Sequence, residues 1–341
     1  MKGFEIISAD KLQKDLDKFL IKGAEPGLKT GFDIIDTSYT VLKGGVTDLT
    51  GWPGSGKTLF LDDLLMSLSQ RYGWKHLLYV PDSGNHQDVY SRLIHKLTGK
   101  TFRKDYDNQI NQAEMYKAMA WVREHFHVLI RNDFKERLSP AEFWEYAIAN
   151  KYDSAVIDSW NFMKHDSSRG TSYLAEILSY RNELAENNNI HFFTIIHPKN
   201  PTEKDYDKEG KLRPANEYTL MGGSEWNNNG KCIISAHKES KDSDIYEIHF
   251  RKIKPDIVGL AGGFIEMQHD WRLRRFYYID PDKFGQKSYA VKTMFADKGT
   301  QTKLEQPKID EQSYYSGNSF KSNRDTHLED NEDFYNEDIP I

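Results

Sequence analysis

Short apolar runs alternate with amphipathic stretches along most of the chain, from about residue 28 to residue 296. This alternation is typical of a mostly parallel β-sheet with helices on both faces. The clearest predicted strands lie at 46–50, 76–80, 128–130, 155–157, 192–196 and 232–236. Two later runs, at 246–250 and 276–279, have no long helical pattern between them, which predicts antiparallel strands at one edge of the sheet. The pattern therefore predicts an α/β fold.

Residues 1–27 precede this alternation and contain one amphipathic pattern. Leu12, Leu16, Phe19 and Leu20 recur at helical spacing, which predicts a short helix from Asp10 to Leu20. The following segment contains glycines and a proline, and it should end that helix. Such a helix at the border of a domain either caps its own domain or packs on a neighbouring subunit, and the pattern leaves both open.

The end of the chain, residues 297–341, has a different composition. It is rich in Lys, Gln, Ser, Asn, Asp and Glu, and its apolar side chains are too sparse to offset the entropy lost on ordering, so we expect it to be disordered. Residues 301–341 hold four basic and ten acidic side chains, and they account for the whole formal net charge of −6. A balanced body can still contain a basic channel, so net charge neither supports nor excludes nucleic acid.

The sequence disfavours a membrane-spanning or secreted protein, and also one held together by disulfides or by a cysteine-based metal site. No apolar run approaches the roughly 18–20 residues that a spanning helix needs, and residues 1–10 lack a signal pattern, so a cytoplasmic location is expected. The single cysteine, Cys232, excludes an internal disulfide and leaves too few thiolates for a cysteine-based metal site.

One segment fits the pattern G-x-x-x-x-G-K-[ST], and its residues are Gly51, Trp52, Pro53, Gly54, Ser55, Gly56, Lys57 and Thr58. It lies between a predicted strand and a helical pattern that continues from Leu59, which is the setting this motif needs. Its glycines let backbone N–H groups turn toward phosphate oxygens at a helix N-terminus. Lys57 can then reach the β- and γ-phosphates of ATP, and the Thr58 hydroxyl can hold Mg²⁺. The alternative is a glycine-rich turn with a solvated lysine, which this context disfavours.

The segment 27–58 resembles the start of the RecA-like domain of replicative ring helicases. Further motifs at 73–75, 79–82, 156–161 and 195–199 fall in the order and spacing of the Twinkle-like branch of the DnaB helicase family. The resemblance covers about residues 27–280 and implies a RecA-like P-loop NTPase core in residues 28–296. It also implies a hexameric ring with ATP sites at subunit interfaces, working 5′→3′ as a helicase on single-stranded DNA in replication. Only about 30 residues precede this region, so no N-terminal primase or loader-binding domain is expected.

The resemblance also implies roles for single residues. Asp158 ends a predicted strand at the Walker B position and would hold Mg²⁺, and His197 follows the next strand, where a polar residue senses the γ-phosphate. Lys252 and Lys254 match positions that present basic groups to the ATP of a neighbouring subunit. Each has a plainer alternative: an ordinary aspartate at a strand end, a histidine satisfied by local contacts, and two solvated lysines.

Two positions depart from the family pattern. Asp82 stands where the resemblance places a catalytic glutamate, and misplacing an attacking water by about 1 Å can cost around 10²-fold in rate. Lys254 stands where many members carry an arginine finger, and lysine cannot form the planar bidentate clamp of arginine. Four other residues could fill these roles: Glu225, Arg251, Arg274 and Arg275. The sequence therefore predicts ATP binding and leaves rapid turnover open.

Two polar segments, 161–169 and 199–213, correspond to the loops that such rings project inward. The second segment holds Lys199, Lys204, Lys208, Lys211 and Arg213. Five basic residues of the two segments are the candidate contacts to the phosphates of single-stranded DNA, namely Lys164, Arg169, Lys199, Lys211 and Arg213. Acidic residues interleave the second segment and nearly neutralise it, namely Glu203, Asp205, Asp207 and Glu209. A solvated surface loop is therefore the alternative.

The last residues, 328–341, are acidic and end in Ile-Pro-Ile, so they resemble the acidic tip of bacterial single-stranded DNA-binding proteins. Such a peptide either docks on a replication partner or acts as a solubilising tail. The sequence as a whole favours a helicase or translocase. The alternative is an ATP-switched RecA-like protein that binds DNA or a partner with slow or no hydrolysis. A recombinase-type filament fits the later motifs less well.

Overall fold

The computed structural model describes residues 7–23, 26–81, 85–130, 137–240, 242–283 and 285–295. The chain divides into two units, Met1–Phe295 and Ala296–Ile341, and the described residues belong to the first. The predicted tail, 297–341, lies outside the described residues, and so does Asp82. The division into a linker helix, a motor domain and a tail therefore stays a prediction.

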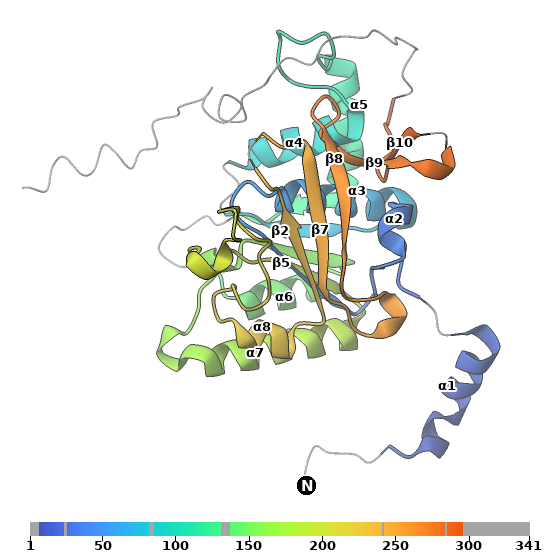
Figure 1. The fold of residues 1–341 in the computed structure, drawn as a ribbon. Coiled ribbons are helices and arrows are strands. Elements are labelled where there is room, and N and C mark those ends of the chain that lie inside the picture. The colour runs from blue at the N-terminus through green and yellow to red at the C-terminus, as the bar shows by residue number, and fades with distance from the viewer. Residues whose placement is uncertain are drawn as a thin grey trace, which may run out of the picture. The chain divides into compact units, whose positions relative to one another are not determined.

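The described residues of the first unit form one ten-stranded sheet, in the order β10-β9-β8-β7-β6-β1-β5-β4-β2-β3 (Figure 1). The parallel part consists of β1 (Val46–Thr50), β2 (His76–Tyr79), β3 (Phe126–Val128), β4 (Ser154–Asp158), β5 (His191–Ile195) and β6 (Cys232–His237). The antiparallel part consists of β7 (Ile245–Lys252), β8 (Phe264–Asp270), β9 (Arg275–Asp280) and β10 (Gln286–Tyr289). The predicted α/β fold with late antiparallel strands is confirmed.

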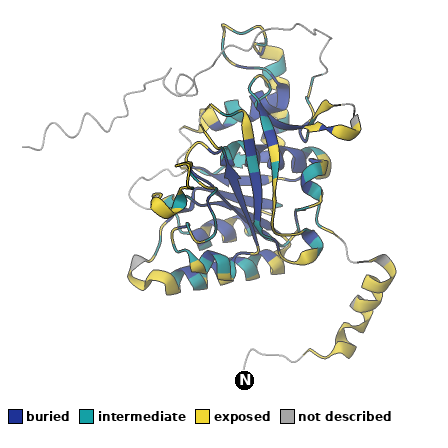
Figure 2. Cartoon of the chain, in the orientation of Figure 1, coloured by how far each residue is buried: buried dark blue, intermediate teal, exposed yellow. Residues whose placement is uncertain are grey.

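Helices cover both faces of this sheet, and each face has its own apolar core (Figures 1 and 2). The helices are α1 (Ala9–Lys22), α2 (Asp33–Asp36), α3 (Lys57–Tyr72), α4 (His86–Thr98), α5 (Gln112–His125), α6 (Pro140–Ala149), α7 (Gly170–Asn188) and α8 (Ser224–Asn229). Side chains of α3, α4 and α5 join one core, and those of α6, α7 and α8 join the other. The central strands are therefore buried on both faces, which explains their continuous apolar runs.

Two strands, β8 and β10, are absent from the sequence prediction. In β8, Phe264–Asp270, buried residues alternate with exposed or half-buried ones, and β10, Gln286–Tyr289, has no buried residue. Strands that are open to water on one face need no apolar run. The third strand also begins two residues earlier than predicted, at Phe126. The predicted N-terminal helix forms as α1, and its apolar side chains are exposed, with Leu20 85% exposed.

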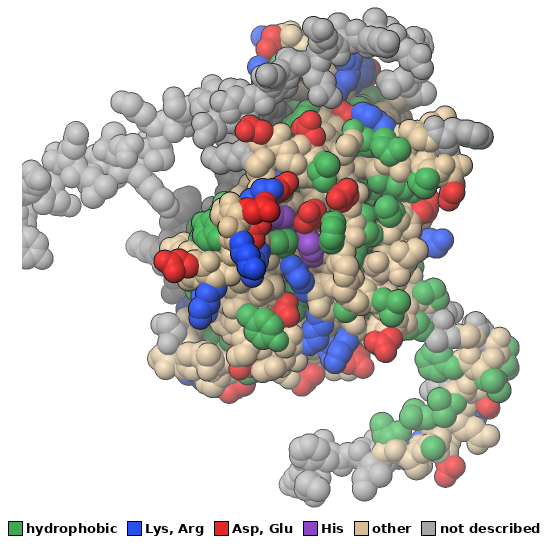
Figure 3. Space-filling model, viewed as in Figure 1, with side chains coloured by type: hydrophobic (Ala, Val, Ile, Leu, Met, Phe, Trp, Pro, Cys, Tyr) green, Lys and Arg blue, Asp and Glu red, His purple; other side chains and the backbone are tan. Residues whose placement is uncertain are grey.

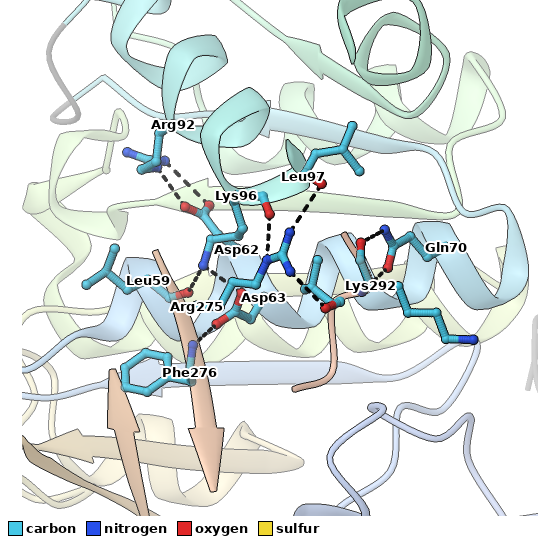
Figure 4. A network of polar contacts seen from close by, with 11 residues as sticks. Leu59, Asp62, Asp63, Gln70, Arg92, Lys96, Leu97, Arg275, Phe276 and Lys292 are labelled. Atoms are coloured by element: carbon cyan, nitrogen blue, oxygen red, sulfur yellow. Dashed lines mark hydrogen bonds and ion pairs between the residues drawn. The ribbon is translucent and has the colours of Figure 1, made fainter. Parts of the chain in front are cut away.

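A buried network of charged groups ties helices α3 and α4 to the antiparallel strand β9 (Figure 4). The Lys96 ammonium on α4 lies 2.7 Å from the Asp63 carboxylate on α3, and both side chains are fully enclosed. The same carboxylate accepts a 2.7 Å hydrogen bond from the Phe276 N–H on β9. The Arg275 guanidinium donates to the carbonyls of Lys96, Leu97 and Val291 and to the hydroxyl of Thr293. Breaking such a pair leaves a charge buried without its counter-ion, so the network fixes how α3 lies against β9.

Candidate nucleotide site

The phosphate loop connects β1, at the centre of the sheet, to α3. Gly51 and Gly56 have φ values of 145° and 84°, in the left-handed region that side chains rarely adopt. A Cβ on Gly51 would lie 2.1 Å from the carbonyl oxygen of Ala236, and one on Gly56 would lie 2.9 Å from the Tyr246 ring. Close packing against β6 and β7 therefore demands glycine at both positions. Pro53 and Gly54 are exposed, whereas Ser55 is buried.

Lys57 is folded back onto its own loop. Its ammonium donates to the carbonyl oxygens of Gly51, at 2.8 Å, and Trp52, at 3.0 Å. Burial lowers the pKa of Lys57 to about 8, and the nearby Asp158 opposes this shift. The loop therefore holds a poorly solvated cation on two neutral acceptors, which anionic phosphate oxygens can replace with a gain in charge pairing.

Thr58 and Asp158 meet at the start of α3. The Thr58 hydroxyl donates a 2.8 Å hydrogen bond to the Asp158 carboxylate at the end of β4. Burial raises the pKa of Asp158, while Thr58 and the charge of Arg92 lower it and the charge of Asp62 raises it. A hydroxyl oxygen and a carboxylate oxygen side by side form a donor set that suits Mg²⁺. These two residues fit the metal-binding role that the sequence predicts.

Arg92 is a residue near this site that sequence reasoning missed. It lies on α4, and its guanidinium forms an ion pair with Asp62 of α3 at 2.6 Å (Figure 4). Both side chains are largely buried, and both charges act on Asp158. The only signal in the sequence is an arginine among the residues of an amphipathic helix, which does not reveal its partner.

Trp52 links the phosphate loop to a distant part of the chain. Its ring is 6% exposed, and its indole N–H donates a 2.7 Å hydrogen bond to the carbonyl oxygen of Arg213. Arg213 belongs to the long connection between β5 and β6, which contains one of the two predicted DNA-contacting segments. The structure therefore brings the phosphate loop and that segment together.

His197 and the two lysines lie at different ends of the sheet. His197 follows β5 directly and is half-buried. Lys252 is half-buried, donates to the carbonyl oxygen of Asn227, and has a pKa lowered by burial and by the positive charges of Lys254 and Lys231. Lys254 is exposed.

The strand register separates these lysines from the phosphate loop of their own chain. Lys252 is paired with Ile233 at the start of β6, whereas Gly51 packs on Ala236 near the end of β6. Three residues along a strand span about 10 Å. Lys252 therefore lies toward the other end of β6 from the phosphate loop of its own chain.

Arg275 is wrong as a substitute for the missing arginine finger. It is 2% exposed, and its guanidinium binds carbonyl oxygens within the chain. Arg251 is half-buried, and burial lowers its pKa although Glu217 and Glu247 oppose the shift. Glu225 lies on α8 and accepts hydrogen bonds from Asn229.

The predicted DNA-contacting residues are all exposed, and two of them are paired with acids of the same chain. Arg169 lies 2.5 Å from Glu176, and Lys211 lies 2.5 Å from Glu239. Lys164, Lys199 and Arg213 are also at the surface. Basic and acidic side chains lie next to one another over the β5–β6 connection on the face shown in Figure 3. Partial neutralisation of this segment, as the sequence predicts, is therefore present in the structure.

The central parallel strands, the phosphate loop after β1 and the acidic residue at the end of β4 together define a RecA-like P-loop NTPase fold. No protein-family profile matches the chain. The chain is 24% identical over 258 residues to the Twinkle homolog protein, chloroplastic/mitochondrial, of Arabidopsis thaliana. That match covers 70% of this chain and 35% of the plant protein, so the chain spans about a third of its length.

Two solved structures resemble the fold. One is the structure of an ATPase domain, with a TM-score of 0.65 and 13% identity, covering 80% of this chain and 99% of that one. The other is a DnaB-like replicative helicase described with its interactions with primase, with a TM-score of 0.62 and 14% identity. That match covers 80% of this chain and 67% of the helicase chain. The predicted resemblance to DnaB/Twinkle-type motor domains is confirmed. Among the described residues, no helix is long and apolar enough to cross a membrane.

Proposed function

We propose that this chain is the motor subunit of an ATP-dependent helicase or translocase that acts on single-stranded DNA in replication. The observation that carries the proposal is the convergence of Lys57, Thr58 and Asp158, where a phosphate loop and a Walker B carboxylate meet. The similarity to a Twinkle homolog and to the fold of DnaB-like ATPase domains supports it.

Lys57 would bind the β- and γ-phosphates of ATP, and the backbone N–H groups of residues 51–58 would surround them. Thr58 and Asp158 would hold Mg²⁺, which neutralises charge that develops on the transferred phosphoryl group. Asp82 would orient the attacking water, and His197 would sense the γ-phosphate. These roles come from the resemblance and from the geometry around Lys57 and Thr58.

We further propose a hexameric ring with ATP sites between subunits and movement in the 5′→3′ direction. The position of Lys252 and Lys254, away from the phosphate loop of their own chain, supports a role at the ATP of a neighbour. The DNA strand would contact the exposed basic residues of the two polar segments, namely Lys164, Arg169, Lys199, Lys211 and Arg213. Two of these, Arg169 and Lys211, would exchange an acidic partner for a phosphate.

The second candidate is an ATP-switched protein that clamps DNA or a partner and turns over slowly. Asp82 and Lys254 favour it, because each lacks a feature of the residue it replaces: the reach of glutamate and the bidentate geometry of arginine. Both candidates require the same nucleotide site, and they differ in turnover and in unwinding.

Strand displacement on a 5′-tailed DNA fork, measured together with ATP hydrolysis, separates the two candidates. Unwinding that depends on ATP supports the helicase, whereas normal ATP and DNA binding without unwinding would leave only the switched clamp. Lys57→Ala should abolish every nucleotide-dependent step, and Lys117→Ala, on the exposed side of α5, is the matched control. Retained hydrolysis in Lys57→Ala would mean that the site is wrongly assigned.

The acidic C-terminal tip, residues 328–341, would dock on a replication partner through its terminal apolar residues and carboxylate. Removing these residues and comparing the captured replication proteins tests this idea, since unchanged partners would leave only a solubilising role. The cytoplasmic location likewise stays a proposal from the sequence.

A further inference from the structure

Trp52 is in contact with both functional parts of the chain at once. Its carbonyl oxygen accepts hydrogen bonds from the Lys57 ammonium, at 3.0 Å, and from the Ser55 N–H, at 3.1 Å. Its indole N–H donates to the carbonyl oxygen of Arg213 at 2.7 Å. Trp52 is therefore bonded to Lys57 through its backbone and to the polypeptide at residue 213 through its side chain.

Arg213 ends a small hairpin, residues 205–213, that is held together by its own hydrogen bonds. The N–H of Arg213 donates to the carbonyl oxygen of Asp205, and the N–H of Asp207 donates to that of Lys211, both at 2.8 Å. The Asp207 carboxylate accepts the N–H groups of Glu209 and Lys211. A shift at Arg213 would therefore displace the whole hairpin, including Lys211.

A second contact joins this hairpin to the rest of the domain, but it is weaker. Lys211 pairs with Glu239 on the β6–β7 turn at 2.5 Å, and the two side chains are 51% and 55% exposed. Exposed pairs of this kind contribute little, because water screens them. The indole hydrogen bond of Trp52 is partly buried and its ring is 6% exposed, so it is better shielded from water than the Lys211–Glu239 pair.

We propose that Trp52 is a coupling residue that transmits the state of the nucleotide site to the 205–213 hairpin. When Lys57 leaves the carbonyl oxygens of Gly51 and Trp52 for phosphate oxygens, the backbone of Trp52 loses a cationic donor and changes position. The indole then carries Arg213 and the hairpin with it. This inference rests on the proposed function in two respects, namely that Lys57 binds the phosphates of ATP and that the hairpin contacts DNA.

The residue type supports this role. The phosphate-binding pattern leaves position 52 open, because its work is done by backbone N–H groups and Lys57. A buried tryptophan there, with its only polar side-chain atom directed at a loop 161 residues away, serves a purpose other than phosphate binding. Replacing it with phenylalanine keeps an aromatic ring and removes the donor.

The experiment compares wild type, Trp52→Phe and Trp226→Phe with and without a saturating non-hydrolysable ATP analogue. The indole N–H of Trp226 donates a 2.8 Å hydrogen bond to the carbonyl oxygen of Met221, which also lies in the connection between β5 and β6. Trp226→Phe is therefore the matched control at a site away from residues 51–58. Amide hydrogen exchange of residues 205–213 reads out the hairpin directly. Affinity for single-stranded DNA, measured with and without the analogue, reads out its effect on binding.

Nucleotide should change amide exchange of residues 205–213 in wild type and in Trp226→Phe. In Trp52→Phe the change in amide exchange should disappear. The factor by which the ATP analogue changes the affinity for single-stranded DNA should become about fivefold smaller and approach one, as expected for one lost hydrogen bond. Trp52→Leu also lacks the donor and should behave in the same way, which covers the case in which the phenylalanine variant does not fold.

Three results would overturn the coupling. An unchanged nucleotide response in Trp52→Phe would reduce Trp52 to a packing role, and an equal loss in Trp226→Phe would reduce the effect to general loosening of the loop. A wild type that binds nucleotide without any response in residues 205–213 would remove the coupling and leave the nucleotide site intact. A wild type that binds no nucleotide would remove the proposed function as well, so the two failures are distinguishable.

Discussion

The hydroxyl of Thr58 donates a 2.8 Å hydrogen bond to the carboxylate of Asp158, 100 residues further along the chain. This contact places the first turn of α3 against the end of β4. It brings together two oxygen atoms that sequence reasoning assigns separately to Mg²⁺. If the Thr58 and Asp158 oxygens hold the same Mg²⁺ ion, removing the Thr58 oxygen should weaken Mg²⁺-dependent hydrolysis.

Thr58→Val keeps the shape of the side chain and removes the oxygen. Mg²⁺-dependent ATP hydrolysis should fall by about 10²-fold, as is typical when one group that stabilises transition-state charge is lost. Titrating hydrolysis against Mg²⁺ measures this, and thermal stability should fall modestly, because the buried Asp158 carboxylate loses a hydrogen bond. Thr37→Val, at an exposed threonine, is the control, and equal activities of the two variants would contradict the metal role.

Nucleotide affinity should depend on pH through Lys57. Burial lowers the pKa of this lysine to about 8, so a growing fraction of the ammonium is neutral above that pH. Bound phosphates favour the charged form, so binding takes up a proton and affinity should fall up to about tenfold per pH unit above 8. The dissociation constant of ATP measured from pH 7 to pH 9.5 gives the slope.

The lowered pKa of Lys57 also makes the stability of the folded chain depend on pH. Because the pKa of Lys57 is lower in the folded chain than in the unfolded one, the unfolded chain binds more protons between about pH 8 and the ordinary value of 10.5. The contribution of Lys57 to stability therefore rises with pH through that window. In Lys57→Ala both effects should vanish, and a persisting pH slope in affinity would assign it to another group.

Lys254→Arg should raise the rate of ATP hydrolysis. The side chain is exposed at the surface, so the change is tolerated structurally, and the guanidinium can form the bidentate clamp that an ammonium cannot. A gain of about tenfold or more is expected, given that arginine fingers contribute 10³–10⁵ elsewhere. Steady-state hydrolysis at concentrations where the chain oligomerises measures it, with Lys231→Arg on the same surface as control.

Asp82→Glu restores the carboxylate length that the resemblance implies. If the shorter side chain limits water placement, hydrolysis should rise by about 10²-fold at most, with little change in ATP affinity. Single-turnover hydrolysis separates this step from product release. A rate equal to or below that of wild type would show that the site is adapted to aspartate.

Lys96→Met should destabilise the fold strongly. Burial lowers the pKa of Lys96 and raises that of Asp63, so removing the ammonium leaves Asp63 enclosed without its counter-ion. A cost of about 3–5 kcal/mol is expected. Lys100→Met removes a partly exposed pair with Glu114 and should cost about 0–1 kcal/mol, so urea unfolding of the two variants gives a matched comparison.

Sequence patterns predict the central parallel strands closely, because strands buried on both faces need continuous apolar runs. They miss β8 and β10, whose residues are partly open to water. The phosphate loop follows from spacing within eight residues, and Asp158 follows from its place after a strand. The bond from Trp52 to Arg213 could not be predicted, because it depends on how two loops 161 residues apart lie in the folded chain.

Arginine is the residue type whose role the sequence reveals least. Arg275 is a candidate finger by position, yet its donors bind carbonyl oxygens from α4 and from the segment after β10. Arg92 is unremarked in the sequence, yet it pairs with Asp62 beside the candidate Mg²⁺ site. Burial separates these two cases from solvated arginines, and burial is a property of the tertiary structure.

The network of Lys96, Asp63 and Arg275 also determines how the chain can be divided. Its members come from α3, α4 and β9, so a fragment ending before residue 275 would keep a buried lysine and aspartate but lose the β9 N–H that binds Asp63. The parallel strands alone would thus be an incomplete folding unit, although they contain the whole phosphate loop. Shortened versions of this protein intended for nucleotide binding should retain residues up to Thr293, whose hydroxyl accepts a hydrogen bond from Arg275 near the end of the described residues.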